Sequence, residues 1–196
     1  MIASSREPGW RNAGFTLIEL MVTIAIAAVL MTLAAPSFVS FLRNSELTST
    51  TNSLVAAIGA ARTEAMKRNF SAFVQPKSGG WISGWVVYAD LNDNDVYDAA
   101  VDYLVLDQPA LPSYFSVSGS GTANGSSPYV RYNSSGYPVN TSDAFGALTF
   151  SLTRNDLSGS AVLEQTRRVK IAKTGRVRTC KPLSSSDTEC SESGNE

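Results

Sequence analysis

The feature that most constrains this chain is a long apolar run near its N-terminus. No charged residue occurs between Leu20 and Leu42. At a rise of about 1.5 Å per residue, a helix of this length crosses a hydrocarbon layer of about 30 Å. The run therefore predicts a transmembrane helix, and Pro36 predicts a kink near Ala34 or Ala35.

A short polar segment, Met1 to Gly14, precedes the apolar run and carries Arg6 and Arg11. By the positive-inside rule these cations place the N-terminal end in the cytoplasm, so the rest of the chain is expected to be exported. A secretory signal has its small cleavage residue after the apolar core. Here Gly14 comes before the core, so cleavage at this glycine would remove the basic leader and keep the helix.

Glu19 is the one ionisable residue within the apolar segment. A carboxyl group in lipid is costly unless it is neutralised or paired, so a partner is expected. The alternative is that Glu19 lies at the interfacial end of the helix and has no specific role.

The run Gly14-Phe15-Thr16-Leu17-Ile18-Glu19-Leu20 resembles the class III leader of type IV prepilins and pseudopilins. The resemblance implies that a prepilin peptidase cuts between Gly14 and Phe15 and methylates the new amino group of Phe15. It also implies that Glu19 meets the N-terminal amine of a neighbouring subunit. The chain would then be a single-pass protein of the bacterial inner membrane, with a periplasmic head, incorporated with other pilin or pseudopilin subunits into a filament.

Beyond Pro36 the helix is expected to continue as an amphipathic segment that ends at Asn69. Spacings of three and four residues predict one apolar stripe that faces a domain, formed by Leu47, Thr51, Leu54, Ile58, Ala61 and Ala65. A soluble coiled coil would require sustained heptads, and this stripe is too short for them.

After Asn69 the hydrophobic period changes from about 3.6 to 2, which predicts an antiparallel sheet. The expected strands are residues 72–75, 85–89, 103–106, 114–118, 129–132, 148–152, all or part of 162–172, and 176–179. Residues 116–127, with repeated Gly and Ser, are expected to be a mobile surface loop.

The segment from Gly80 to Asp95 resembles the first head hairpin of the GspH/FimT family of minor pilins and pseudopilins. Trp81 and Trp85, with Gly84 between them, are predicted to turn both rings into the core; the alternative is a contact with a partner. The resemblance implies an α+β, type IV pilin-like fold, in which a long N-terminal helix packs on an antiparallel sheet. The expected parts are a cleaved leader (1–14), a transmembrane and assembly helix (15–42), an amphipathic helix half (43–69), a β-rich head (70–182) and a polar tail with a disulfide loop (183–196).

Composition argues against an enzyme. The chain has no histidine and two cysteines, which removes most routes to metal ligation, His-based acid–base catalysis and Cys/His nucleophiles. No cofactor and no metal site is predicted.

The acidic segment after the second tryptophan has the oxygen-rich spacing of a calcium loop, in Asp90, Asn92, Asn94, Asp95 and Asp98. Asp95 replaces the glycine of such a loop, and Val101 replaces its bidentate glutamate. A plain turn, in which these side chains bind local backbone, is therefore favoured over a cation site.

Cys180 and Cys190 are predicted to form one disulfide in an oxidising compartment, and the alternative is two unpaired thiols. The sequence after Cys180 is polar and acidic, with no apolar residue beyond Leu183. It is expected to be largely disordered outside the disulfide loop.

Basic residues gather just before this tail. Seven of the sixteen cations lie between Arg167 and Lys181, with no acid among them. Alternation of charged and apolar residues around Lys173-Thr174-Gly175 predicts a two-stranded hairpin. Arg176 and Arg178 would project from one face about 6.6 Å apart and could hold two phosphates.

The predicted DNA-contact residues are Arg168, Lys170, Lys173, Arg176, Arg178 and Lys181. No stacking aromatic lies within the hairpin, which favours contact with the backbone of double-stranded DNA. Gly175-Arg176-Val177-Arg178 also resembles the Gly-Arg-x-Arg element of FimT-type minor pilins associated with DNA uptake. The alternatives are docking to an acidic neighbour in the filament and a solvated face with no role.

The resemblance to the GspH/FimT family implies a minor pilin at or near the tip of a type IV pilus that takes part in its assembly, with non-specific DNA binding as an attached hypothesis. The alternative is an H-type minor pseudopilin of a type II secretion system. An enzyme lacks any converging nucleophile and base in this sequence.

Overall fold

The computed structural model describes residues 14–193, apart from the side chains of residues 33 and 36. The predictions for the leader cations Arg6 and Arg11, and for the last three residues of the tail, lie outside the described residues. The chain divides into two compact units, Met1–Arg43 and Asn44–Glu196, and helix α1 (Leu17–Arg68) contributes to both.

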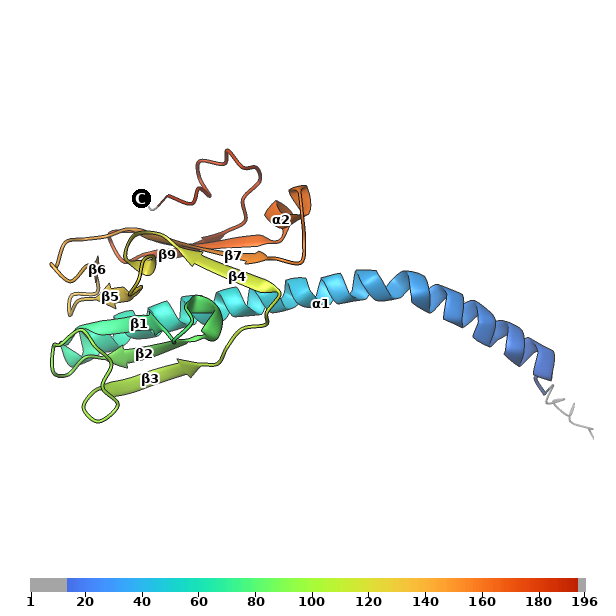
Figure 1. Ribbon diagram of the computed structural model, residues 1–196, viewed down its shortest axis with the longest axis horizontal. Helices are drawn as coiled ribbons and strands as arrows, with labels where there is room; N and C mark the ends of the chain where they lie inside the picture. The colour runs from blue at the N-terminus through green and yellow to red at the C-terminus, as the bar shows by residue number, and fades with distance from the viewer. Residues whose placement is uncertain (1–13, 194–196) are drawn as a thin grey trace, which may run out of the picture. The chain divides into compact units, whose positions relative to one another are not determined.

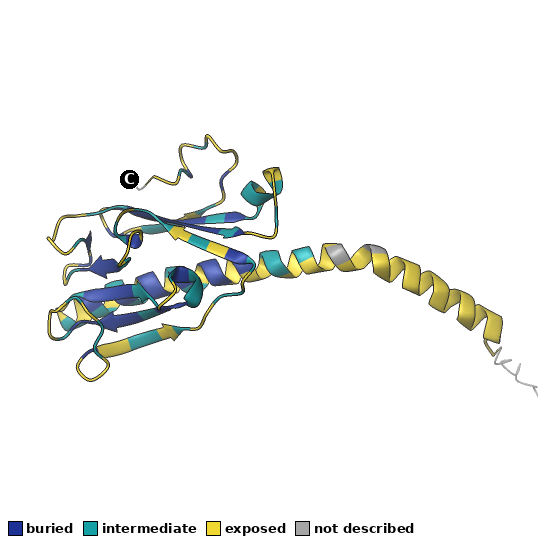
Figure 2. Cartoon of the chain, viewed as in Figure 1, coloured by how far each residue is buried: buried dark blue, intermediate teal, exposed yellow. Residues whose placement is uncertain are grey.

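The first unit consists of the apolar half of α1. Its large apolar side chains are exposed in the single chain, from Phe15 to Leu42 (Figure 2). No single helix among residues 14–193 meets the length and apolarity of a membrane span, but Leu17–Thr32 and Ser37–Arg68 meet them together, with a bend of 45° between them. The bend lies beside Pro36, where the kink was predicted.

The remainder of α1 carries the predicted apolar stripe, which is buried in the second unit. Leu47, Leu54 and Ile58 are fully buried, and Thr51 donates a hydrogen bond from Oγ1 to the Leu47 carbonyl at 2.7 Å. The helix ends at Arg68 because Asn69 adopts a left-handed conformation, with φ of 59°, while its N–H still binds the Ala65 carbonyl. The expected end at Asn69 is therefore confirmed.

The second unit contains two antiparallel sheets (Figure 1) where the sequence predicted one. The first has the order β3-β2-β1-β5-β6, formed by β1 (Ala72–Pro76), β2 (Trp85–Ala89), β3 (Tyr103–Gln108), β5 (Val130–Tyr132) and β6 (Pro138–Val139). The second has the order β4-β7-β8-β9, formed by β4 (Phe115–Gly119), β7 (Leu148–Arg154), β8 (Thr166–Ile171) and β9 (Val177–Cys180). The alternation of apolar and polar residues predicts which face of each strand is buried. It does not predict which strands pair with one another, and so it does not divide the strands between two sheets.

Part of the strand expected within residues 162–172 is present as β8, Thr166–Ile171, and residues Ser160–Glu164 before it form a short helix, α2. One local expectation is corrected. In the expected loop 116–127, Ser116–Gly119 belong to β4 and Gly121–Ala123 form a 3₁₀ turn. That turn is fixed because the Trp81 indole N–H donates to the Ala123 carbonyl at 2.9 Å.

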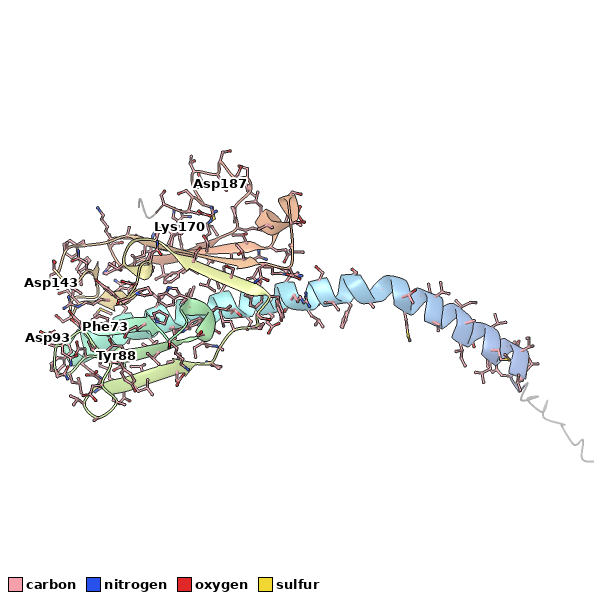
Figure 3. The ribbon with its side chains drawn as sticks, viewed as in Figure 1. Phe73, Tyr88, Asp93, Asp143, Lys170 and Asp187 are labelled. Atoms are coloured by element: carbon pink, nitrogen blue, oxygen red, sulfur yellow. A yellow bond between two sulfur atoms is a disulfide. The ribbon has the colours of Figure 1, made fainter. Side chains whose placement is uncertain are left out.

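One core joins the α1 stripe to the inner faces of both sheets. Trp81 and Trp85 are both buried in it, as predicted, and the Trp81 ring meets Phe150 edge-on at 4.8 Å between centroids. On the opposite face of the first sheet, the rings of Phe73 and Tyr88 stack at 5.2 Å (Figure 3). Both sheets are thus anchored on the helix.

Candidate functional site

The start of α1 is organised by a reciprocal pair of side chains. Glu19 Oε2 accepts hydrogen bonds from the Thr16 backbone N–H at 2.9 Å and from Thr16 Oγ1 at 2.8 Å. The Glu19 N–H donates to Thr16 Oγ1 at 3.2 Å. This is a capping box, in which two helix-start donors that lack helical partners are satisfied by side chains.

The capping box gives Glu19 a second role besides the predicted assembly contact. Sequence reasoning did not identify it, although the Thr-x-x-Glu spacing was a sufficient signal. Phe15, just before the box, is 85% exposed. The residues at the predicted processing site therefore form an accessible helix start with one carboxylate fixed beside it.

The predicted basic hairpin forms from β8 and β9. Lys170 lies opposite Arg178, and Ile171 lies opposite Val177. The turn closes through the Gly175 N–H, which donates to the Ala172 carbonyl at 2.8 Å, and the Ala172 N–H, which donates to the Arg176 carbonyl at 2.9 Å. Alternation along β8 places Val169 and Ile171 in the core and turns Arg168 and Lys170 to the outer face.

Arg62 of α1 holds the tip of this hairpin. Its Nη1 donates to the Gly175 carbonyl at 3.0 Å and its Nη2 to the Thr174 carbonyl at 3.4 Å. Gly175 has a φ of +79°, and a Cβ added there would lie 2.5 Å from the Gly136 carbonyl oxygen. No local sequence signal points to Arg62 as part of the site, because it lies 113 residues from the turn that it holds.

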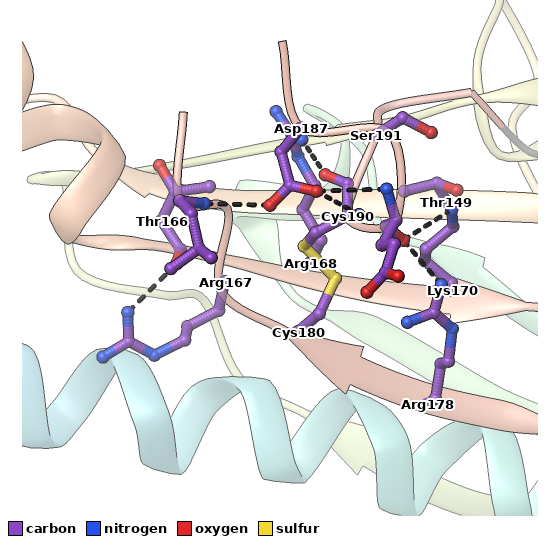
Figure 4. The surroundings of a disulfide bond; sticks show 12 residues. Thr149, Thr166, Arg167, Arg168, Lys170, Arg178, Cys180, Asp187, Cys190 and Ser191 are labelled. Atoms are coloured by element: carbon purple, nitrogen blue, oxygen red, sulfur yellow. Dashed lines mark hydrogen bonds between the residues drawn. A yellow bond between two sulfur atoms is a disulfide. The ribbon is translucent and has the colours of Figure 1, made fainter. Parts of the chain in front are cut away.

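Two of the predicted DNA-contact residues are not on the surface. Arg168 is 7% exposed and Lys170 is 2% exposed, because the segment after Cys180 folds back over them (Figure 4). Arg168 donates to the Cys190 carbonyl and to Glu192 Oε1, the latter at 2.9 Å. These two residues cannot contact DNA directly in this arrangement, which corrects the expectation that they would.

The folded-back segment also contacts Lys170 and Arg178. Lys170 Nζ lies 3.4 Å from the Glu189 carbonyl oxygen, and Arg178 Nη2 donates to the same oxygen at 2.6 Å. Thr149 Oγ1, on β7, donates to the Ser193 carbonyl at 3.3 Å. We call residues 187–193 the C-terminal cover.

The predicted disulfide between Cys180 and Cys190 is confirmed, with 5.9 Å between the Cα atoms. Inside the loop that it closes, the Asp187 carboxylate accepts hydrogen bonds from the backbone N–H groups of Leu183, Glu189 and Cys190, each at 3.0 Å. These backbone donors, those of Leu183 and Cys190 first, hold the pKa of Asp187 below its usual value. The tail is thus ordered past the disulfide as far as Ser193, which corrects the expectation of disorder there.

Three predicted contact residues remain exposed: Lys173 in the turn, Arg176 at its end, and Lys181 beyond β9. Arg178 is half-buried against the cover. The accessible basic surface is therefore the hairpin end with Lys181, and it is smaller than the predicted set.

The acidic loop uses its carboxylates for its own backbone. Asp90 accepts from the N–H groups of Asn94 and Asp95, at 3.3 and 2.8 Å. Asp102 accepts from those of Leu91 and Asp98, at 3.0 and 2.7 Å. Within residues 14–193, no group of three or more His, Cys, Asp or Glu is placed to hold a metal ion.

Comparison with known proteins gives two family matches. The family described as type II transport protein GspH matches residues 50–175, more than half of the chain. The motif described as the prokaryotic N-terminal methylation motif matches residues 11–35. No curated protein sequence matches the chain.

Two solved proteins share the fold. The type IV minor pilin FimU of Pseudomonas aeruginosa is 16% identical, with a TM-score of 0.51, and the match covers 68% of this chain and 91% of that one. The minor pseudopilin EpsH from the Type 2 Secretion System of Vibrio cholerae is 14% identical, with a TM-score of 0.50, and the match covers 71% of this chain and 99% of that one. At these identities the likeness concerns the fold.

Proposed function

Because the chain belongs to the GspH family of type II transport proteins, we propose that it is a minor subunit of a type IV pilus, located at or near the filament tip. The observation that carries this proposal is the presence in one chain of an N-terminal methylation motif, an exposed apolar helix half and a GspH head. Its role is structural, and we assign it no catalytic step.

In this proposal, the first half of α1 anchors the subunit in the bacterial inner membrane, with the head in the periplasm. A prepilin peptidase removes residues 1–14 and methylates Phe15. The exposed apolar side chains of this half support the proposal, since each lies open to lipid or to a neighbouring subunit. Glu19 then meets the amino group of a neighbouring subunit, since a carboxylate in lipid requires an opposite charge.

The assembly role of Glu19 can be separated from its capping role by two substitutions. Glu19→Gln keeps a side chain that completes a capping box but removes the charge, and Glu19→Ala removes both. If the charge drives assembly, both variants should reach the membrane at wild-type level and be at least about tenfold depleted from sheared filaments, measured by immunoblot. Incorporation of both variants at wild-type level would overturn the assembly role, and loss of Glu19→Ala alone would assign the residue to capping.

We also propose that the exposed hairpin end binds double-stranded DNA without sequence preference. Lys173 and Arg176 are exposed there, and Arg62 holds the turn that presents them. Lys181, beyond the other end of β9, is exposed as well. Arginine and lysine bind phosphate oxygens through charge-assisted hydrogen bonds, so affinity should fall steeply with salt.

A salt series with a labelled duplex and the full chain in nonionic detergent tests this contact. Log affinity falls against log salt with a slope whose magnitude grows by about 0.9 for each phosphate contact, so Lys173→Gln with Arg176→Gln should reduce that magnitude by nearly two. Lys67→Gln is the matched control, because it also removes one exposed positive charge but lies on α1, outside the hairpin. The Lys67 side chain is 65% exposed and forms an ion pair with Glu64 of the same helix. Equal slopes for the wild type and the double variant would exclude the hairpin end as a DNA contact.

The second candidate function is that of a minor pseudopilin in a type II secretion system, favoured by the family description and the fold shared with EpsH. A deletion strain separates the two functions. Loss of surface pili with intact secretion supports the pilus, and loss of secretion with intact pili supports the pseudopilus.

A further inference from the structure

We propose that the C-terminal cover occupies a second polyanion-binding face, formed by Arg168, Lys170 and Arg178, and that the Cys180–Cys190 disulfide keeps this face closed. The inference rests on the proposed function for its ligand class, a nucleic acid backbone. It concerns a different surface from the exposed hairpin end, so the two can fail separately.

The three cations form one compact cluster on the outer face of the second sheet. Arg168 and Lys170 are alternate residues of β8, so their side chains leave the same face about 6.6 Å apart. Arg178 lies directly opposite Lys170 on β9. Figure 4 shows the three residues around the disulfide, with Cys190 and Asp187 of the folded-back segment.

Backbone carbonyl groups of the cover contact all three cations. Glu189 and Cys190 contribute carbonyl oxygens to all three, and Glu192 contributes the carboxylate that forms an ion pair with Arg168. The carboxylate side chain is 73% exposed, so this pair is weak. A phosphate backbone would bring full negative charges and more acceptor oxygens to the same donors.

Apart from its polar contacts with the second sheet, the cover is held by the disulfide and by little apolar burial. Between residues 183 and 193, Cys190 is the one buried residue, and Leu183 is 89% exposed. A segment without apolar anchors does not recover the conformational entropy lost when it is ordered. The disulfide removes much of that loss by tethering residue 190 to β9.

The test compares closed and opened forms of the full chain in nonionic detergent, with a labelled DNA duplex in a salt series. The opened form is Cys180→Ser with Cys190→Ser. We expect duplex binding to tighten at least about tenfold at low salt and the salt slope to steepen by up to about 2.7, since three cations become available at about 0.9 each. Treating the oxidised wild type with a thiol reductant should produce the same change, and the reductant should leave the serine variant unaffected.

Two further variants test whether tighter binding by the opened form comes from a loose tail or from residues other than the three cations. Deleting residues 183–196 in the Cys180→Ser background opens the face without a loose tail, and it should behave as the serine variant does. Adding Arg168→Gln, Lys170→Gln and Arg178→Gln to the opened form should return the slope to the closed value. Far-ultraviolet circular dichroism identifies any variant that is unfolded, and in that case the deletion variant decides.

The outcomes separate the two proposals. An unchanged slope in every folded opened variant overturns the covered face, even if the wild type binds DNA through the hairpin end. Binding by the opened forms alone supports the covered face and excludes the exposed hairpin end. If no form binds the duplex at low salt, both proposals fail.

Discussion

At the scale of single residues, the site depends on a few side chains and one glycine whose partners are distant in sequence. Arg62 holds the β8–β9 turn through two backbone carbonyls, and the backbones of Gly136 and Gly175 meet so closely that no side chain fits between them. The exposed Lys173 lies two residues before Gly175, and the exposed Arg176 follows it directly. The presentation of the basic hairpin end is therefore decided by backbone contacts.

Gly175→Ala should destabilise the protein and disturb the hairpin end. The substitution places a Cβ in a left-handed conformation, which costs about 1–2 kcal/mol, and brings it 2.5 Å from the Gly136 carbonyl oxygen. We expect a loss of about 2–4 kcal/mol in the free energy of unfolding, measured by urea denaturation.

Gly125→Ala is the matched control, because Gly125 has a φ of +105° but open space around its Cβ position. It should lose only the conformational part, about 1 kcal/mol. Equal losses for the two variants would show that the close approach between Gly175 and the Gly136 carbonyl contributes nothing.

At the scale of elements, α1 changes character along its length. Its first half exposes large apolar side chains, whereas its second half buries one stripe against both sheets and exposes polar residues. In the proposed function one helix serves two environments, because a transmembrane segment needs apolar residues all round and a surface helix needs them on one face only.

Leu54→Ala tests how far the stripe carries the stability of the second unit. Leu54 is fully buried, so the truncation should cost about 2–5 kcal/mol in the free energy of unfolding. Met66→Ala, on the same helix, should cost less than about 1 kcal/mol, because Met66 is 47% exposed. The measurement is thermal or urea unfolding of the full chain in detergent, and similar losses for both variants would contradict a core centred on the stripe.

At the scale of the whole molecule, the two units differ in what stabilises them. All buried hydrophobic residues that the structure describes belong to the second unit, beginning at Leu47. The first unit has no core of its own among residues 14–43, so its stability depends on its surroundings.

A fragment of residues 44–196 should therefore fold without the first unit. We expect it to be soluble and monomeric by size-exclusion chromatography, and to unfold within about 3 °C of the full chain in detergent, because the core is retained. A midpoint more than about 10 °C lower, or a fragment that aggregates without detergent, would show that the first unit contributes to the stability of the head.

The sequence alone determined the features that depend on local period and local motif. Neighbours within a few residues were enough to predict four features: the motif Gly14–Leu20, the stripe from Leu47 to Ala65, the helix end at Asn69 and strand β2. The structure has β2 at the predicted bounds and the left-handed Asn69 directly after the helix. The capping box of Thr16 and Glu19 could have been read in the same way.

The tertiary structure decided which distant groups meet. Alternation showed that Arg168 and Lys170 share a face, but it did not show that the carbonyls of Glu189 and Cys190 would cover that face. In the same way it gave the strands without dividing them between two sheets. The physical reason is that period records which side of an element is buried, whereas the partner of a backbone carbonyl or a sheet edge is selected by packing between segments far apart in the chain.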